Sequence, residues 1–356
     1  MGLLTAISGG GAKGPACFLL EAEGRRLLLD LGYGPQPGLW PDVSRVGKVD
    51  ALLLSHAHRD HAGGLKLLPD IGNPPLYLSE PLAHLLKDHA IGGIFPLHDT
   101  TEVMGFKVTT GRNGHAPGGV WIHVDTCGGV LYMGDCCFES LIYAYDPPPP
   151  ARIVIIDTSY GSYETPLTEC ARMLDEQCLG KDVLMPLPPG GRAPEIALHF
   201  VRKGVAPALD DAVRQATGWL GAEHAESALP GVRSELARIA RDAPAIGGRG
   251  ISLAATADGT AGMAARLIEK YEQASAPDII FTGYLPPGTP AERTTRSGRA
   301  KYIRWNVHPR FSDNVALVRA TRAQIVIPAF GGPKTGEDWA RVFAPAQVVL
   351  STVVDL

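Results

Sequence analysis

The chain has 356 residues, of which 45% are hydrophobic and 20% charged, and its formal net charge is −4. This composition is typical of a folded protein with a sizeable core and excludes an extensively disordered chain. The acidic balance excludes an overall basic field, so any surface that binds nucleic acid must be local. The six cysteines form no CxxC pair, and the sequence shows neither a signal peptide nor an apolar run of the ~20 residues that span a bilayer. We therefore expect a reduced, cytoplasmic protein that does not bind membranes.

Two kinds of sequence pattern follow one another along the chain. Up to about residue 160, short runs with strand character alternate with turns that contain glycine, as in the apolar runs ALLLSH and IVIIDTS. From about 165 to 285, helical patterns with apolar residues three and four apart alternate with single strands, which is typical of an α/β domain. After about residue 300, strands and one helical pattern return.

A cluster of potential metal ligands follows the first of these apolar runs. The stretch SHAHRDH contains His56, His58, Asp60 and His61. Such a loop can direct two imidazoles to one metal ion, and a carboxylate with a third imidazole to a second ion. Zinc favours these ligand types and, in catalytic sites, keeps one position open for water. The alternative is a polar loop with incidental histidines, but three in six positions make metal binding the stronger interpretation.

Two further candidate ligands follow other predicted strands. His115 comes after FKVTT, and Asp135 ends the strand VLYM. Each residue alone would more often be a loop histidine or a turn cap. Together with the first cluster they complete a set that can hold two metal ions, with Asp135 between them.

The pattern of these residues resembles the metal-binding motifs of the metallo-β-lactamase superfamily. Its HxHxDH motif matches His56, His58, Asp60 and His61, and its later histidine and aspartate match His115 and Asp135. The resemblance implies a four-layer αββα hydrolase that uses zinc-activated hydroxide, with Asp30 as structural support under the metal loop.

Four further stretches resemble the β-CASP nucleases of the same superfamily, which include Artemis-type DNA nucleases and ribonuclease J. The stretches occur in the family's order: IVIIDTSYGS, PLPPGGRAPEI, IIFTGYLPPGTPAER and WNVHPRFSDN. The resemblance implies a core formed by residues 1–163 and 295–356, with an inserted α/β β-CASP-like cap domain at 164–294. It also places Asp157 and His308 at family motif positions.

One position departs from the family pattern. RNA-processing members carry a histidine after the last core strand, whereas the corresponding stretch here, IPAFGGP, has Phe330. Phenylalanine cannot bind a metal, so one or two zinc ions are expected, with a weaker second site that Mn²⁺ could occupy. DNA-directed members lack this histidine, which modestly favours DNA over RNA.

The resemblance also suggests catalytic and substrate-binding roles. His308 would contact the scissile phosphate or protonate the leaving oxygen, Asp157 would hold His308, and Asp60 would orient the attacking hydroxide. Basic side chains could neutralise substrate phosphates, although such runs are often only solvated surface. The basic candidates are Arg192, Arg293, Arg296, Arg299 and Lys301.

The sequence thus predicts a metal-dependent phosphodiesterase that cleaves single-stranded nucleic acid, DNA slightly favoured over RNA. One alternative keeps the metal centre but hydrolyses a small molecule such as a thioester, lactone or nucleotide, and a ribonuclease is the other enzymatic alternative. A third is a binding protein with a vestigial centre, which the complete ligand set disfavours. The oligomeric state stays open.

Overall fold

The chain forms two compact units in a computed structural model that describes residues 2–222, 227–331 and 336–356. Unit 1 comprises the chain up to Phe138, then Ala144–Glu164 and His308–Leu356. Unit 2 comprises Glu139–Tyr143 and Thr165–Val307.

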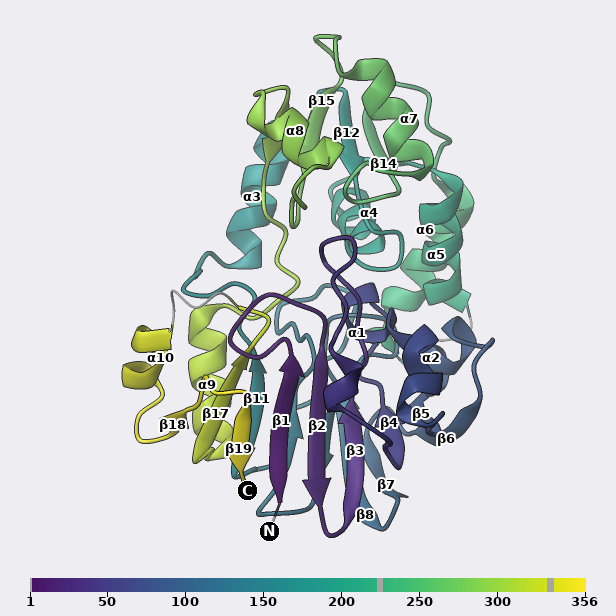
Figure 1. The fold of residues 1–356 in the computed structure, drawn as a ribbon. Coiled ribbons are helices and arrows are strands. Elements are labelled where there is room, and N and C mark those ends of the chain that lie inside the picture. The colour runs from purple at the N-terminus through teal and green to yellow at the C-terminus, as the bar shows by residue number, and fades with distance from the viewer. Residues whose placement is uncertain (1, 223–226, 332–335) are drawn as a thin grey trace. The chain divides into compact units, whose positions relative to one another are not determined.

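Unit 1 is built on two sheets, each with seven strands among the described residues (Figure 1). The first sheet has the order β19 (Val353–Asp355), β1 (Leu3–Ser8), β2 (Cys17–Ala22), β3 (Arg25–Leu29), β4 (Ala51–Leu53), β5 (Leu76–Ser79) and β6 (Ile91–Phe95). The second has the order β18 (Gln347–Val348), β17 (Ile325–Ala329), β11 (Ile153–Asp157), β10 (Val130–Tyr132), β9 (Val120–Val124), β8 (Phe106–Arg112) and β7 (Asp99–Val103).

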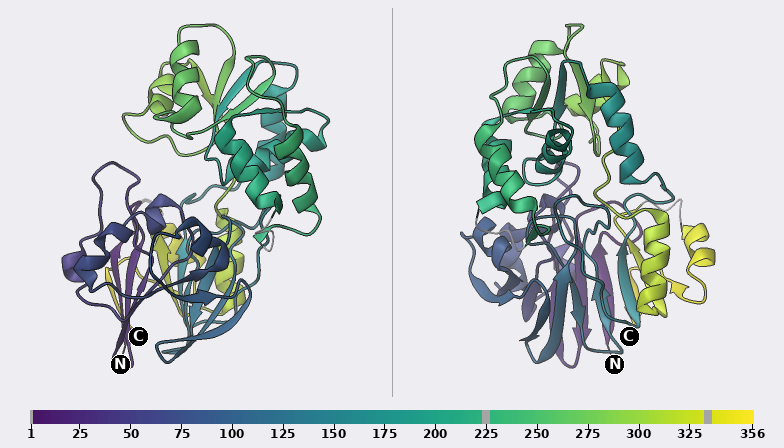
Figure 2. Two further views of the ribbon diagram at one scale, coloured as in Figure 1. Left: turned by 90° about the vertical axis from the view of Figure 1, so that its right-hand side faces the viewer. Right: turned by 180° about the vertical axis from the view of Figure 1, so that it is seen from behind.

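The alternation of side chains along the strands gives each sheet two apolar faces. In β2, Phe18 and Leu20 point into the core between the two sheets, where they meet residues such as Ile122 of β9. Cys17 and Leu19 point to the opposite face, into a separate apolar cluster. The stacking of the two sheets can be followed in Figure 2.

Helices cover both outer faces and complete four layers. The first sheet packs against η2 (Leu65–Ile71) and α2 (Glu80–Leu85), and the second against α9 (Phe311–Thr321) and α10 (Gly336–Val342). The short η1 (Val43–Arg45) and α1 (Arg59–Ala62) lie in connections of the first sheet. The αββα architecture expected from the sequence is therefore confirmed.

Unit 2 is an α/β domain around a parallel sheet. Its strand order is β13 (Ala208–Leu209), β14 (Ile251–Ala254), β12 (Val183–Pro186), β15 (Asp278–Phe281) and β16 (Ala300–Tyr302). Its helices are α3 (Leu167–Cys178), α4 (Arg192–Arg202), α5 (Asp211–Ala222), α6 (Val232–Asp242), α7 (Gly262–Tyr271) and α8 (Pro290–Arg296). Because β16 pairs with β15, unit 2 extends to Val307, whereas we expected the chain to return to the core at residue 295.

No helix in the described ranges combines the length and apolar character needed to cross a membrane. All six cysteines lie in the described ranges, and none of them forms a disulfide bond.

Candidate metal centre

The HAHRDH stretch forms a tight loop in unit 1 directly after β4. α1 begins after His58. His56, before the helix, and His61, within it, are both directed inward, with 0% and 1% of their surface exposed. The backbone of Gly32 packs against the same loop. A Cβ at Gly32 would lie 1.8 Å from the carbonyl oxygen of Asp60, so only glycine fits this close approach.

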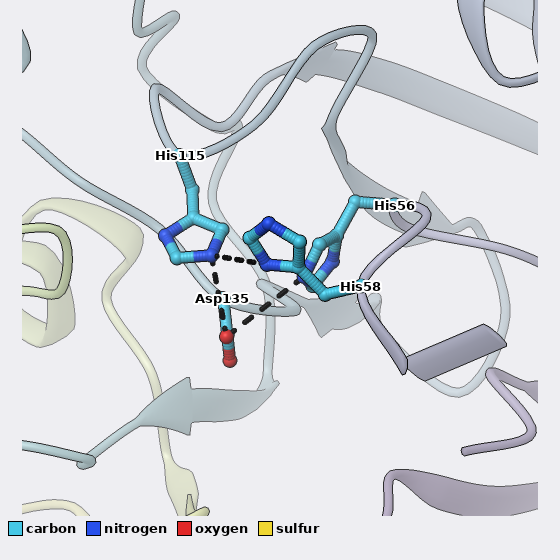
Figure 3. A group of neighbouring side chains, drawn as sticks. All are labelled: His56, His58, His115 and Asp135. Atoms are coloured by element: carbon cyan, nitrogen blue, oxygen red, sulfur yellow. Dashed lines mark hydrogen bonds and ion pairs between the residues drawn. The ribbon is translucent and has the colours of Figure 1, made fainter. Parts of the chain in front are cut away.

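The second sheet contributes the other candidate ligands. His115 follows β8 and Asp135 follows β10, and both side chains lie against His56 and His58 (Figure 3). The four possible ligand atoms all lie within 4.8 Å of one another. The structure thus brings together four residues from three places in the sequence that the sequence analysis assigned to one site.

The spacing of these four ligand atoms fits a tetrahedral metal. Zinc bonds of about 2.0–2.1 Å place neighbouring ligand atoms about 3.3 Å apart. His58 Nδ1 and His115 Nε2 are 3.0 Å apart, and Asp135 Oδ2 lies 3.4 Å from His115 Nε2 and 3.8 Å from His56 Nε2. His56 Nε2 is also buried without a hydrogen-bond partner, which is costly unless a cation takes that place. The residues therefore fit a divalent metal.

A second group shares Asp135 with the first. Asp60, His61 and Asp135 have ligand atoms within 4.8 Å of one another. His61 Nε2 lies 3.1 Å from Asp135 Oδ1, which is the carboxylate oxygen not used in the first group. Asp135 is therefore placed to bridge two ions.

Phe330 occupies the neighbourhood of this second group. Its ring lies edge-on to the ring of His61 at a centroid distance of 4.9 Å, and its backbone φ is 61°. The second group therefore has three possible protein ligands among the described residues, against four in the first. Gly332 and Pro333, which end the IPAFGGP stretch, lie outside the described residues.

Asp30 lies beneath the metal loop, fully buried, with donors on both oxygens. Oδ1 accepts the Ser55 backbone N–H at 2.7 Å, and Oδ2 lies 2.7 Å from His61 Nδ1. Oδ2 also accepts the hydroxyls of Ser55 and Tyr132, each at 2.6 Å. Because Nδ1 of His61 is held in this way, its Nε2 faces Asp135.

Ser55 extends this arrangement to His56. Its hydroxyl lies 3.0 Å from His56 Nδ1 while it donates to Asp30. The imidazole therefore donates from Nδ1, and the lone pair of Nε2 is left for a metal. Sequence reasoning missed Ser55 and Tyr132. Ser55 could have been noticed because it directly precedes His56, whereas nothing local identifies Tyr132.

His308 and Asp157 form a pair beside the ligands. His308 Nδ1 lies 2.7 Å from Asp157 Oδ2 and 3.8 Å from Asp135 Oδ2. Asp157 is buried and also accepts the Ser159 backbone N–H at 2.9 Å. The ring of His308 lies 4.9 Å from that of His115, so this pair belongs to the same cluster.

Burial and the neighbouring charges move the pKa values of the histidines in opposite directions. Burial lowers the pKa of His56 and of His58, which favours the neutral form that binds a metal. Burial also acts to lower the pKa of His61, but Asp135 and Asp30 raise it well above its ordinary value. The position between those two carboxylates therefore favours a positive charge.

Asp60 is ionised near neutral pH. Burial acts to raise its pKa, but the charges of His61, His58 and Lys13 lower it below the ordinary value of 3.8. An ionised carboxylate at this position can bind a cation or accept a proton from water.

The predicted substrate-binding side chains lie in unit 2, and several have partners there. Arg293 pairs with Glu272, the guanidinium of Arg299 donates to backbone carbonyls, and Lys301 lies 3.0 Å from Asp278. Arg192 lies against Gly283, where a Cβ would be 1.5 Å from its guanidinium. Arg296 is in the last turn of α8. Their role in substrate binding stays a prediction.

Comparison with known proteins places this centre in a family context. Residues 10–176 match the family model described as the metallo-beta-lactamase superfamily. A structure titled as a protein of unknown function from Enterococcus faecalis V583 shares the fold, with a TM-score of 0.63, 13% identity and full coverage of both chains.

Relatives in sequence include three differently named proteins. Transcription termination factor FttA of Cenarchaeum symbiosum is 27% identical over 56% of this chain and 39% of its own length. Endoribonuclease YSH1 of Kluyveromyces lactis is 28% identical over 54% of this chain and 32% of its own. The RNase J-like protein of Methanocaldococcus jannaschii is 28% identical over 54% and 53%, respectively. The match spans about a third to a half of the length of these relatives. By its motif, its fold and these matches, residues 10–176 of the chain are similar to the metallo-β-lactamase superfamily, and the chain has relatives among the β-CASP nucleases.

Proposed function

We propose that the protein is a metal-dependent phosphodiesterase that cleaves single-stranded nucleic acid. The observation that carries this proposal is the joint presence of the buried ligand set around Asp135 and the His308–Asp157 pair next to it. A ligand set supplies a place for a hydrolytic metal, and a histidine held by a carboxylate supplies a proton donor beside it.

Zinc is the proposed ion, with Mn²⁺ as the alternative for the second group. His56, His58, His115 and Asp135 would hold the first ion, and Asp60, His61 and Asp135 the second. A bound ion of this kind supplies a Lewis acid for a phosphoryl oxygen and makes water a better nucleophile at neutral pH.

The remaining steps fall to side chains of this chain. Asp60, ionised near neutral pH, orients the attacking water and accepts its proton. The bond from the water oxygen to phosphorus forms as the bond to the leaving oxygen breaks. His308 gives its proton to that leaving oxygen. Burial acts to lower the pKa of His308, but Asp157 and Asp135 raise it above the ordinary value of 6.5, which keeps the proton available near neutrality.

The relatives support RNA as the first substrate to test. Two of the three are named as an endoribonuclease and an RNase J-like protein. The phenylalanine at position 330 favoured DNA on the sequence alone, so both strands belong in the experiment. We propose RNA ahead of DNA because the relatives' names outweigh a single altered position.

The test incubates metal-quantified protein with end-labelled single-stranded RNA and with DNA of the same sequence, in Zn²⁺ and in Mn²⁺. The Asp60→Ala variant should lose cleavage, and Asp70→Ala, an exposed aspartate of the same unit, should retain it. Faster cleavage of RNA would support the proposed order of substrates, and faster cleavage of DNA would reverse it.

The same preparation is then given a thioester, a lactone and a nucleotide. Turnover of one of these, without cleavage of either strand by metal-loaded protein, would overturn the nuclease proposal and support a small-molecule hydrolase.

A further inference from the structure

The glycine-rich loop between β1 and β2 is anchored on the metal centre from two sides. It reads GGGAKGPA over residues 9–16, and it lies at the same end of the first sheet as α1 (Figure 1). On one side, Ala16 donates its backbone N–H to the carbonyl of Asp60 at 2.7 Å. This bond attaches the return of the loop to the residue that follows His58 and Arg59 in the metal-binding stretch.

The other side of the loop is attached to the end of β17. Gly11 donates its N–H to the carbonyl of Pro328, and Phe330 donates its N–H to the carbonyl of Gly9, each at 2.8 Å. The neck is closed by the Ser8 hydroxyl, which donates to the carbonyl of Pro15 at 2.5 Å. Between these anchors, residues 12–14 are left as a short tip whose position is determined by both sides of the metal centre.

Lys13 is the basic residue of this tip, and its side chain is exposed. Ala16, three residues after Lys13, is hydrogen-bonded to Asp60 of α1, and Gly9, four residues before Lys13, is hydrogen-bonded to Phe330. The ring of Phe330 in turn lies 4.9 Å from that of His61. The loop therefore places Lys13 beside the second ligand group, which contains Asp60 and His61.

A cation beside the carboxylates of this centre would favour the binding of a phosphodiester substrate. The centre contains the carboxylates of Asp30, Asp60, Asp135 and Asp157 within one cluster. Bound metal would offset part of this negative charge, but the non-bridging oxygens carry a charge of their own that a lysine ammonium can meet directly. The basic side chains Arg293, Arg299 and Lys301 are engaged with partners inside unit 2.

We propose that Lys13 is a substrate-binding residue whose ammonium contacts a non-bridging oxygen of the scissile phosphodiester beside Asp60. The proposal rests on the proposed function, because it presupposes a phosphorylated substrate. In this proposal the β1–β2 loop makes the protein prefer anionic ester substrates to neutral ones.

The first experiment measures binding of inorganic phosphate to zinc-loaded protein by calorimetry. Lys13→Gln should weaken binding about tenfold to a hundredfold, as expected for the loss of one charge-assisted hydrogen bond. Lys13→Arg should keep most of the affinity because it keeps the charge. Lys87→Gln, which removes an exposed lysine elsewhere in unit 1, should bind phosphate like the unaltered protein. Zinc content and urea unfolding of all variants should be unchanged.

The second experiment compares substrates. With bis(p-nitrophenyl) phosphate, Lys13→Gln should raise KM and lower kcat/KM, whereas turnover of the neutral p-nitrophenyl acetate should stay the same. With single-stranded RNA, the slope of log affinity against log salt should fall by about 0.7, the contribution of one phosphate contact.

Three results would overturn the assignment of Lys13. These are wild-type phosphate affinity in Lys13→Gln, an equal loss in Lys87→Gln, and absence of phosphate binding by the unaltered zinc-loaded protein. Phosphate binding that depends on Lys13, in a protein that cleaves neither RNA nor DNA, would instead keep the assignment and reject the nuclease proposal. The two proposals can therefore fail separately.

Discussion

Replacing Asp30 by asparagine tests whether the buried carboxylate prepares two metal ligands at once. The backbone should tolerate the change, because Asp30 has a φ of 58° and asparagine is among the few residues that adopt this left-handed conformation readily. The side chain keeps its shape but exchanges one acceptor oxygen for an N–H₂ donor.

The cost follows from the donors around the two oxygens. If the amide nitrogen replaces Oδ2, it faces His61 and the hydroxyls of Ser55 and Tyr132; if it replaces Oδ1, it faces only the Ser55 backbone N–H. The second orientation is therefore favoured. It leaves one buried donor unpaired, which should lower the free energy of unfolding by about 1–3 kcal/mol. Loss of the charge behind His61 should weaken metal binding by about 10- to 100-fold.

Two assays measure these effects separately. Competition with a chromophoric chelator gives the zinc affinity, and urea unfolding of the metal-free protein gives the stability. Asp70→Asn, an exposed aspartate in the same unit, serves as the control. Unchanged zinc affinity in a folded Asp30→Asn protein would refute the view that Asp30 orients the ligands.

Three further predictions concern other parts of the structure. Glu195 is buried and accepts hydrogen bonds from a tryptophan, a serine and a backbone amide. Glu195→Gln should turn a donor toward at least one of these groups and lower the free energy of unfolding in urea by about 1–3 kcal/mol. An unchanged midpoint of urea unfolding would contradict this. Burial acts to raise the pKa of Asp157, but His308 lowers it below the ordinary value of 3.8. The pKa of His308 is in turn raised above its ordinary value of 6.5. Their pair should therefore stabilise the metal-free protein most between about pH 4 and 6.5, losing the contribution of His308 as the pH rises through its folded pKa and that of Asp157 as the pH falls through its own. Asp157→Asn should flatten that profile in pH-dependent unfolding, and an identical profile would exclude the pair as its source. Phe330→His places an imidazole beside the second ligand group. Calorimetric titration should therefore show tighter binding of the second ion with little change in the first. If both ions bind with the affinities of the unaltered protein, position 330 does not reach the metal.

The metal loop shows how much local sequence can specify. His56, His58, Asp60 and His61 lie within six positions, so the backbone of one short loop decides which side chains share a face, whatever surrounds it. The alternation in β2 is local in the same sense. Phe18 faces one core and Leu19 the other, because side chains alternate along any strand.

The basic run after residue 292 shows the limit of such reasoning. The spacing of Arg293, Arg299 and Lys301 indicated a surface for phosphates, but it cannot reveal the carboxylate and carbonyl partners that unit 2 supplies. The end of unit 2 was misplaced for a related reason. Whether β16 belongs to one unit or the other is decided by its pairing with β15, and strand pairing is a long-range property.

By itself, the sequence determined the ligand types, the order of the motifs and the fold class, since these depend on residue chemistry and short-range periodicity. Only the tertiary structure decided that Asp30 holds His61 while Ser55 connects it to His56, that His308 meets Asp157, and that the loop carrying Lys13 is hydrogen-bonded to Asp60. These contacts join residues up to 151 positions apart in one hydrogen bond. Their existence depends on sheet register and on loops anchored between two sheets, and no local pattern encodes either.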